Sequence, residues 1–426
     1  MNKRDLLING FAAAVTAAKP EGRFVELPAP PKGKVIVLGA GKAAASMAAA
    51  FERAWFTQHP SSALTGLVVT RYDHTAPTTH IKVVEASHPV PDEAGQNTTK
   101  LILKMAKCAT EDDLVVFLIS GGASALLTYP ADGLAFETKQ EINKHLLRVG
   151  APIDQMNLVR QSLSAIKGGR LAAAAHPADM VTYLISDVPG DAPQTIGSGP
   201  TVNWTETPEE RATEALSILE RYDISVGPEV TELIKNNLAP PFEAGPVHML
   251  ATPQSALTAA AEYFKQRGYG VEIMGDAIEG EAKEVAKTFA GICRQILSHQ
   301  QPFPTPLVLL SGGETTVTVK GTGRGGRNAE FLLAFLIAIE AFDVSRRISA
   351  IACDTDGIDG VETNAGAVIG PETLNQARAL GLNPQNYLDN NDAFGFFEQL
   401  DALVTTGPTL TNVNDFRAIL IESPES

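Results

Sequence analysis

Cysteines, aromatic residues and long apolar runs are all scarce in this chain. Its 426 residues include three cysteines, Cys108, Cys293 and Cys353, and only 6% are aromatic. An odd, scattered cysteine set predicts neither a disulfide framework nor a zinc site, and it favours a reducing compartment. No apolar stretch reaches the length of a membrane span without a charged residue or a glycine. We therefore expect a cytoplasmic protein.

Positive charge is also in short supply. Lysine and arginine number 34 against 49 aspartates and glutamates, which gives a formal net charge of -15. This balance argues against nucleic acid or an anionic membrane as the main partner. A phosphorylated substrate stays compatible with it, because a local basic pocket can outweigh a distant negative field. The eight histidines show no metal-ligand spacing.

The first residues have a superficial likeness to a signal peptide. Lys3 and Arg4 precede an apolar run, but Asp5 interrupts the basic flank, and Asn9 and Gly10 break the run. We expect an amphipathic helix that packs on the body of the protein.

The chain length predicts two domains, and the order of elements predicts an α/β fold. In the first half, short apolar segments alternate with helical spacing, which is typical of a parallel sheet with helices on both faces. The expected strands are 34–38, 67–70, 81–84, 114–119 and 181–185, and the expected helices are 2–18, 43–56, 98–108 and 137–176, the last broken at 168–169.

A second half begins after the proline-rich stretch 239–241. Alternating threonine and valine at 315–320 predicts a hairpin with the preceding strand, and hence a mixed sheet. The other expected strands are 247–250, 271–274, 307–310 and 348–352, and the expected helices are 255–267, 280–298 and 328–341.

The tripeptide Ser-Gly-Gly occurs twice, at 120–122 and 311–313, each time directly after a short apolar run. Such runs are typical of buried strands that enter a tight loop. Glycines there let the backbone approach a ligand and turn its N–H groups toward an anion. The repeat predicts two sheets, each with an edge that binds phosphate or carboxylate.

The segment 39–44, Gly-Ala-Gly-Lys-Ala-Ala, follows a strand and opens a helix, with the spacing of a dinucleotide-binding turn. No acidic residue ends the next strand, and the segment does not match a Walker loop. Lys42 at a helix N-terminus fits phosphate binding better. The alternative is a tight turn with a solvated lysine.

Two further segments could form basic rims. Lys167 and Arg170 flank a Gly-Gly break and follow Arg160, although Arg160 could simply lie on a solvated helix face. The glycine-rich segment 321–326 leads into Arg327, which could hold a carboxylate or phosphate through two N–H groups. Asn328 is expected to cap the helix that follows.

Two acidic turns follow buried strands. Asp187 and Asp191 could deprotonate a hydroxyl or hold Mg²⁺, and turn chemistry is the alternative. The segment 353–360 places Asp354, Asp356 and Asp359 within six residues, where like charges need a cation. The preceding strand and the absence of a terminal glutamate exclude an EF-hand, so Mg²⁺ with nucleotide phosphates is the better interpretation, again with turn chemistry as the alternative.

Taken together, these segments resemble the glycerate 2-kinase family with a C-terminal MOFRL domain, historically also labelled hydroxypyruvate reductase. Leu410 departs from the pattern, since the family more often has glycine there. The resemblance rests on GAGKAA (39–44), SHPVPDEAG (87–95), ISGGASALL (119–127), LSAIKGGRLA (163–172), SDVPGD (186–191), GSGPT (197–201), LSGGETTVTVKGTGRGGRNAE (310–330), DTDGIDG (354–360) and TGPTLTNVND (406–415).

The resemblance implies a Rossmann-like N-terminal domain, 1–240, a smaller α/β MOFRL domain with a mixed sheet, 241–426, and an active site in the interdomain cleft. It implies ATP-dependent phosphorylation of D-glycerate at the 2-hydroxyl, with Lys42 and Arg327 as the best-matched catalytic residues. Asp187 or Asp191 would orient or deprotonate the hydroxyl, and Asp354 and Asp356 would hold Mg²⁺. The expected substrate- and nucleotide-binding residues are Gly39, Gly41, Ser120, Gly121, Gly122, Lys167, Arg170, Gly312, Gly313, Glu314 and Asn328.

Two other functions stay open at this point. An NAD(P)H-dependent hydroxypyruvate reductase would account for the 39–44 turn, but it requires an acid–base histidine and gives the 321–327 loop no role. A sensor of sugar acids or nucleotides would account for the anion loops alone. The sequence leaves the oligomeric state open, a homodimer included.

Overall fold

The computed structural model describes residues 2–341 and 347–424, which divide into two compact units. One unit, here the parallel-sheet unit, comprises Pro20–Ser186 and Asp191–Leu250. The other, here the mixed-sheet unit, comprises Met1–Lys19, Asp187–Gly190 and Ala251–Ser426. Among the described helices, none has both the length and the apolar character needed to cross a membrane.

The parallel-sheet unit is built on six strands in the order β3-β2-β1-β4-β5-β6. The pairs β1–β2, β1–β4, β2–β3 and β4–β5 are parallel, as the sequence predicts. β1 and β4 are buried along their whole length, because helices cover both faces of a sheet of this kind. The strands are β1 (Val35–Ala40), β2 (Leu64–Arg71), β3 (Ile81–Ala86), β4 (Leu114–Ser120), β5 (Asp179–Ile185) and β6 (Val247–Ala251).

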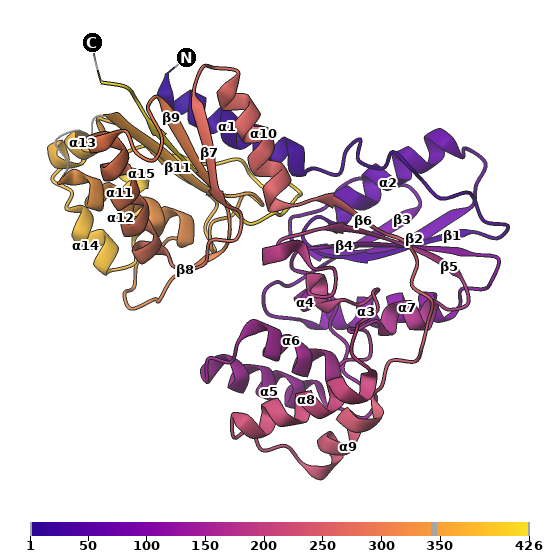
Figure 1. Ribbon diagram of the computed structural model, residues 1–426. Helices are drawn as coiled ribbons and strands as arrows, with labels where there is room; N and C mark the ends of the chain where they lie inside the picture. Colours follow the sequence, from indigo (N-terminus) through magenta and orange to yellow (C-terminus); the bar gives the residue numbers. More distant parts are fainter. Residues whose placement is uncertain (1, 342–346, 425–426) are drawn as a thin grey trace. The chain divides into compact units, whose positions relative to one another are not determined.

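Helices lie on both faces of this sheet (Figure 1). α2 (Ala44–Gln58) covers one face, and α3 (Glu93–Lys107) and α7 (Arg170–Ala175) cover the other. The N-terminus of α3 is fixed by Asp92, whose Oδ1 accepts from the Gly95 N–H at 2.9 Å. Short helical turns follow two of the strands: α4 (Ala123–Leu126), η1 (Pro189–Asp191) and η2 (Ile196–Ser198).

Four helices of the same unit pack around an apolar core of their own, which includes Ile142, Leu146 and Val159. They are α5 (Phe136–Arg148), α6 (Ile153–Ser162), α8 (Pro208–Arg221) and α9 (Pro228–Asn236). The helix expected over 137–176 is therefore three helices, α5, α6 and α7. It breaks first at Gly150, which has a positive φ of 69°, because the left-handed backbone ends α5.

The mixed-sheet unit contains a six-stranded sheet in the order β13-β12-β11-β14-β9-β7. Of its five described strand pairs, β7–β9 is parallel and the other four are antiparallel. The predicted mixed sheet is thus confirmed. The strands are β7 (Gly270–Gly275), β9 (Leu307–Ser311), β11 (Ile348–Asp354), β12 (Gly366–Ile369), β13 (Leu403–Val404) and β14 (Asp415–Ile421).

The hairpin predicted between 307–310 and 315–320 is wrong. β9 already has β14 on one side and β7 on the other, so neither of its edges can accept the following segment. Only Thr315–Thr316 is extended (β10), and it pairs in parallel with β8 (Gly280–Glu281) in a separate small sheet.

The helices of this unit also lie on both faces of its sheet (Figure 1). α1 (Lys3–Ala18) and α10 (Pro253–Lys265) cover one face, and α11 (Ala282–His299) and α12 (Arg327–Glu340) cover the other. The remaining helices are α13 (Thr373–Ala379), α14 (Pro384–Asp389) and α15 (Ala393–Gln399).

The division by packing differs from a single boundary at residue 240. The first helix, α1, packs with the C-terminal half of the chain, and the Thr411 hydroxyl donates to the Ala18 carbonyl at 2.7 Å. In the other direction, β6 extends the parallel sheet from beyond residue 240. The ranges 1–240 and 241–426 remain a prediction about family domains.

Gly39 tests the packing of the parallel sheet. A Cβ on this residue would lie 2.3 Å from the Leu118 carbonyl oxygen in the neighbouring strand, so Gly39→Ala should destabilise the parallel-sheet unit by about 3 kcal/mol. Urea unfolding followed by tryptophan fluorescence measures this, since Trp55 and Trp204 both belong to that unit. The control is Gly133→Ala, where the φ of 87° is unfavourable but the space is open. It should cost about 1 kcal/mol, and equal losses in the two variants would contradict the packing argument.

Candidate functional site

In the parallel-sheet unit, the turn that carries Lys42 packs directly on the first Ser-Gly-Gly loop. The Lys42 N–H donates to the Gly121 carbonyl at 2.8 Å, and the Ala43 N–H donates to the Ser120 hydroxyl at 3.0 Å. A Cβ on Gly41 would lie 2.1 Å from that hydroxyl, so only glycine fits there. The adjacent parallel strands β1 and β4 bring these two loops to the same carboxyl edge of the sheet.

Gly122 completes this edge. Its backbone is left-handed, with φ at 79°, and a Cβ there would meet the His88 ring at 3.1 Å and the Lys42 Cγ at 3.2 Å. The lysine stem therefore runs across Gly122. Five predicted residues thus lie together at this edge: Gly41, Lys42, Ser120, Gly121 and Gly122.

Lys167 is buried, with 2% of its surface exposed, and its ammonium group points toward the helix that follows the same loop. Nζ donates to the Ser124 carbonyl at 2.7 Å and to the Ser124 hydroxyl at 3.3 Å. Burial lowers the pKa of Lys167 well below its usual value, and the nearby charges of Lys139 and Arg160 lower it further.

Lys139 is a basic residue that the sequence analysis missed. It is 3% exposed, and its Nζ has no hydrogen-bond partner among the described residues. Burial, with a further contribution from Arg160, lowers its pKa to about 8. It stands three residues before Ile142 on α5, on the face that packs into the core. A lysine at an apolar position of an amphipathic helix is the signal that could have identified it.

Arg170 has a different setting from Lys167. Its Nη1 donates to the carbonyls of Lys167 at 2.8 Å and Gln161 at 3.1 Å, and its Nη2 donates to the Asn237 carbonyl. Arg170 is thus committed to backbone carbonyls that fix the 161–168 segment. Burial, with a contribution from Arg211, lowers its pKa to about 10.

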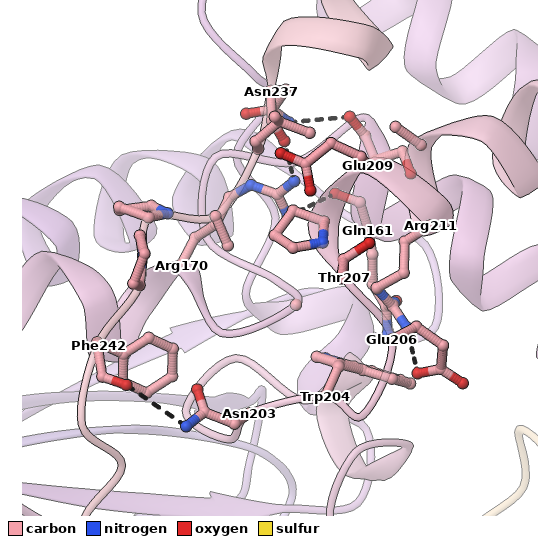
Figure 2. Close-up of a pocket in the computed structure, with 18 of the residues that line it drawn as sticks. Gln161, Arg170, Asn203, Trp204, Glu206, Thr207, Glu209, Arg211, Asn237 and Phe242 are labelled. Atoms are coloured by element: carbon pink, nitrogen blue, oxygen red, sulfur yellow. Dashed lines mark hydrogen bonds and ion pairs between the residues drawn. The ribbon is translucent and has the colours of Figure 1, made fainter.

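Arg170 also forms one wall of a cavity of about 590 Å³ in the parallel-sheet unit (Figure 2). The Arg211 guanidinium lies 3.5 Å above the centre of the Trp204 ring, while its Nη2 donates to Gln161 and its Nη1 lies 3.8 Å from Glu206. Charged and aromatic side chains line this cavity, but its two arginines already have protein partners.

In the mixed-sheet unit, Arg327 is the first residue of α12 and contacts three carboxylates. Its Nε donates to Asp415 at 2.7 Å, its Nη2 to Asp354 at 2.8 Å and its Nη1 to Glu314 at 3.1 Å. Burial opposes the charge, but Asp415, Asp354 and Glu314 outweigh it and raise the pKa of Arg327 well above its usual value.

Arg327 resolves a conflict within the sheet. Asp354 and Asp415 lie directly opposite each other on the antiparallel strands β11 and β14, where like charges repel. One guanidinium that donates to both offsets one of the two negative charges and reduces their repulsion. Of the five N–H groups of Arg327, three make these bonds, so two do not donate to any described residue.

Asp415 and Arg417 are a second pair that the sequence analysis missed. Both are buried, and Arg417 Nη2 donates to Asp415 Oδ2 while its Nη1 donates to the Gly312 carbonyl at 3.0 Å. Arg327 and Arg417 lower the pKa of Asp415, although burial acts in the opposite direction. The sequence contains no motif that would have predicted this pair, because Asp-Phe-Arg is typical of an ordinary strand.

The second Ser-Gly-Gly loop uses much of its backbone internally. The Gly312 N–H donates to the Gly275 carbonyl at 2.9 Å, and the Gly313 carbonyl accepts from the Asp415 N–H at 3.0 Å. Gly313 has a positive φ of 109°, and a Cβ there would collide with Ile278 at 2.2 Å. These glycines therefore serve close packing, and the Gly312 N–H is already satisfied without a ligand.

The expected helix cap is wrong in one respect. Asn328 is the second residue of α12, Gly326 is at the N-cap position, and the side chain that binds the first N–H groups of the helix is that of Asp359. Asp359 Oδ1 accepts from the Asn328 N–H at 3.0 Å, and Oδ2 accepts from the Ala329 N–H at 2.8 Å. The Asn328 side chain instead donates to Asp415 at 2.8 Å. Burial raises the pKa of Asp359 to about 6, although the two N–H bonds favour the carboxylate.

The fit of Asp354 and Asp356 to a metal ion is limited. Asp354 Oδ2 accepts from Arg327, and its Oδ1 accepts from the Asp356 N–H at 3.1 Å. Within the residues that the structure describes, no group of three or more potential metal-ligating side chains comes together. The acidic turn does not form a metal cage by itself. An ion held here would need further ligands from phosphates and water, which is how Mg²⁺ is commonly bound by one or two protein carboxylates.

The two aspartates of the 186–191 turn belong to different units. Asp187 belongs to the mixed-sheet unit, where its Oδ2 accepts from the Asn412 side chain at 2.9 Å and its carbonyl accepts from Asn414. Asp191 belongs to the parallel-sheet unit, and its Oδ1 is buried with no hydrogen-bond partner among the described residues.

The comparisons with known proteins cover nearly the whole chain. Residues 7–235 match a domain of unknown function, DUF4147, and residues 307–415 match the MOFRL family. A protein of Agrobacterium vitis, provisionally named hydroxypyruvate reductase, is 46% identical over 99% of this chain and 95% of its own length. A D-glycerate 2-kinase of Thermotoga maritima is 35% identical over 97% of each chain. The crystal structure of a glycerate kinase from Thermotoga maritima matches with a TM-score of 0.86 and 34% identity, covering 98% of this chain and 99% of that one.

Asp415→Asn tests the buried ion cluster. The variant removes the charge that both Arg327 and Arg417 contact, so we expect the mixed-sheet unit to lose about 3–5 kcal/mol of stability. Hydrogen exchange of α12 and β14, measured by mass spectrometry, reports on this unit. The matched control is Glu314→Gln, whose parent side chain is 49% exposed, and it should change stability by less than about 1 kcal/mol. Unchanged protection in Asp415→Asn would show that the cluster is dispensable.

Proposed function

Because the chain belongs to the glycerate 2-kinase family with a MOFRL domain, we propose that it catalyses the ATP-dependent phosphorylation of D-glycerate to 2-phospho-D-glycerate. The match in sequence and fold to glycerate kinases over almost the full length supports this activity. The alternative hypothesis, hydroxypyruvate reductase activity, is supported only by the provisional names of two relatives.

The single structural observation that carries the proposal is the state of Arg327. Three carboxylates fix its guanidinium, yet two of its N–H groups make no bond within the described residues, and the side chain is 22% exposed. A fixed cation with unused donors is suited to a phosphoryl group or a carboxylate, because it needs no rearrangement as charge develops.

We assign the remaining roles from the geometry of each unit. Lys42, held against the Ser120–Gly122 loop, would neutralise phosphate charge at the carboxyl edge of the parallel sheet. Asp191 would accept a hydrogen bond from the substrate hydroxyl, because its buried Oδ1 has no partner among the described residues. Asp187 is the weaker candidate, since the Asn412 side chain already donates to its carboxylate.

Kinase activity implies ATP, and we propose Mg²⁺ as its companion ion. Asp354 and Asp356 would contact the ion, and the ion would neutralise charge on the phosphates when bound. The phosphoryl group passes from ATP to the 2-hydroxyl oxygen of glycerate, and ADP leaves. The proton of that hydroxyl goes to the carboxylate of Asp191.

The activity assay couples the product to enolase. Purified protein is incubated with D-glycerate, ATP and Mg²⁺, and enolase converts 2-phosphoglycerate to phosphoenolpyruvate without a phosphoglycerate mutase. We expect a signal that depends on all three components. NADH consumption with hydroxypyruvate in the absence of that signal would replace the kinase proposal with the reductase.

Arg327→Lys tests the catalytic assignment. Lysine keeps one positive charge but lacks the planar fork, so it cannot hold Asp354 and Asp415 and still present N–H groups to a ligand. We expect turnover to fall by roughly 10²–10³-fold in the enolase assay. The control, Arg324→Lys, changes an exposed arginine of the same loop that pairs with Glu398 at 3.4 Å, and it should keep near-normal turnover. Near-normal kinetics in Arg327→Lys would remove Arg327 from the site.

A further inference from the structure

Three basic side chains converge inside the parallel-sheet unit from separate segments. Lys139 comes from α5, Arg160 from α6, and Lys167 from the segment that precedes α7. Lys139 and Lys167 are 3% and 2% exposed. Arg160 acts electrostatically on both lysines, and Lys139 also acts on Lys167, so the three form a single cluster, here the basic cluster.

The basic cluster has no acidic counterpart. The charged groups that act on Lys139 and Lys167 are all cationic, and none of the three basic residues forms an ion pair with another described residue. Within the described part of the chain, the Arg160 side chain makes one hydrogen bond, from Nη1 to Asn157 Oδ1 of its own helix at 3.4 Å. Buried charges are normally paired, because an isolated charge loses its hydration without compensation. A bound anion would supply the negative charge that these buried basic groups lack.

Of the three basic residues, Lys139 is the one for which the described residues offer no stabilising partner. Its Nζ is buried without a hydrogen-bond partner, although its helix face packs among apolar residues where methionine or leucine would fit. Its pKa of about 8 still leaves the ammonium group mostly charged at neutral pH. Groups that reduce stability in this way persist mainly at sites where they serve binding or catalysis.

The surroundings supply polar groups beside the cluster. Lys167 Nζ contacts Ser124, and the Ser124 and Ser198 hydroxyl oxygens lie 2.8 Å apart. Ser124 lies in α4, directly after the Ser120–Gly122 loop that holds Lys42. The basic cluster is thus connected through α4 to the carboxyl edge of the parallel sheet.

We propose that Lys139, Arg160 and Lys167 form a binding site for an oxyanion of a small-molecule ligand. The shared chemistry is a carboxylate or phosphate group, and the choice between the hydroxy-acid substrate and the nucleotide as its source rests on the proposed kinase function. Lys139 and Arg160 donate to the anion, and Lys167 stays fixed to Ser124, where a bound anion would favour its charged form.

Binding without turnover tests this site. Isothermal titration calorimetry is carried out with D-glycerate, ATP and inorganic phosphate, each alone, on the full chain and on Lys139→Met. We expect at least one of the three ligands to bind at least tenfold more weakly to the variant. Loss confined to D-glycerate and phosphate identifies the acid's carboxylate as the occupant, and loss of ATP identifies a nucleotide phosphate.

The controls distinguish the loss of a charge inside the basic cluster from the loss of a positive charge elsewhere on the protein. Lys144→Met removes an exposed lysine from the same helix and should leave all three affinities unchanged. Arg160→Gln changes a half-buried member and should weaken the same ligand, which covers the case in which Lys139→Met does not fold. Unchanged affinities in both cluster variants, or no binding of any of the three to the unmodified chain, would overturn the proposal. Lys139-dependent binding in a protein that fails the enolase assay would leave the site intact and reject the kinase function.

A stability measurement gives a second readout. Burial lowers the pKa of Lys139 from 10.5 to about 8, so the folded state disfavours its charge, with Arg160 and Lys167 as the charged groups that face it. This penalty is complete below pH 8 and disappears as the pH rises to about 10.5. Without ligand, Lys139→Met should therefore melt at a higher temperature than the parent at pH 7, with the difference closing toward pH 10.5. A lower melting temperature at pH 7 would show that Lys139 supports the fold and would contradict the proposal.

Discussion

The mixed-sheet unit depends on one buried carboxylate, Asp415. It accepts hydrogen bonds from α12 through Arg327 and Asn328, from its own strand through Arg417, and from the Thr315 N–H at 3.2 Å. A carboxylate that receives this many donors stays ionised even without solvent. These donors come from distant parts of the sequence. The Asp415 carboxylate therefore holds α12 and the segment at Thr315 against β14, although no strand pairing joins α12 to β14.

The two units handle charge in opposite ways. Around Arg327, carboxylates outnumber arginines. Backbone N–H groups stabilise the additional negative charge, as the Asn328 and Ala329 N–H groups do when they donate to Asp359. The basic cluster around Lys139 contains positive charge alone. A chain with a formal net charge of -15 can attract small anions only through such local exceptions, since its overall field repels them. Local composition, rather than net charge, decides which ligands each unit can accept.

Sequence patterns predicted the elements better than the contacts between them. The parallel strands were recognisable because buried segments such as β4 are uniformly apolar, and glycine positions such as Gly41 reflect close backbone approach that few residues allow. The 315–320 hairpin failed because local alternation carries no information about which strand edges are occupied. Asp415 and Lys139 were not predicted, because most of the residues that define their surroundings are more than twenty positions away in the sequence.

The position of α1 has a consequence for how the molecule is made. Among the described elements this helix is synthesised first, yet it packs on a sheet that includes β14, the last of them. Translation proceeds at about 5–20 residues per second, so roughly 20–80 s separate the synthesis of α1 from that of β14. The parallel-sheet unit, complete at Leu250, can acquire its structure during that interval. The apolar face of α1, with Leu7 and Phe11, therefore stays without its strand partners until β14 has been made.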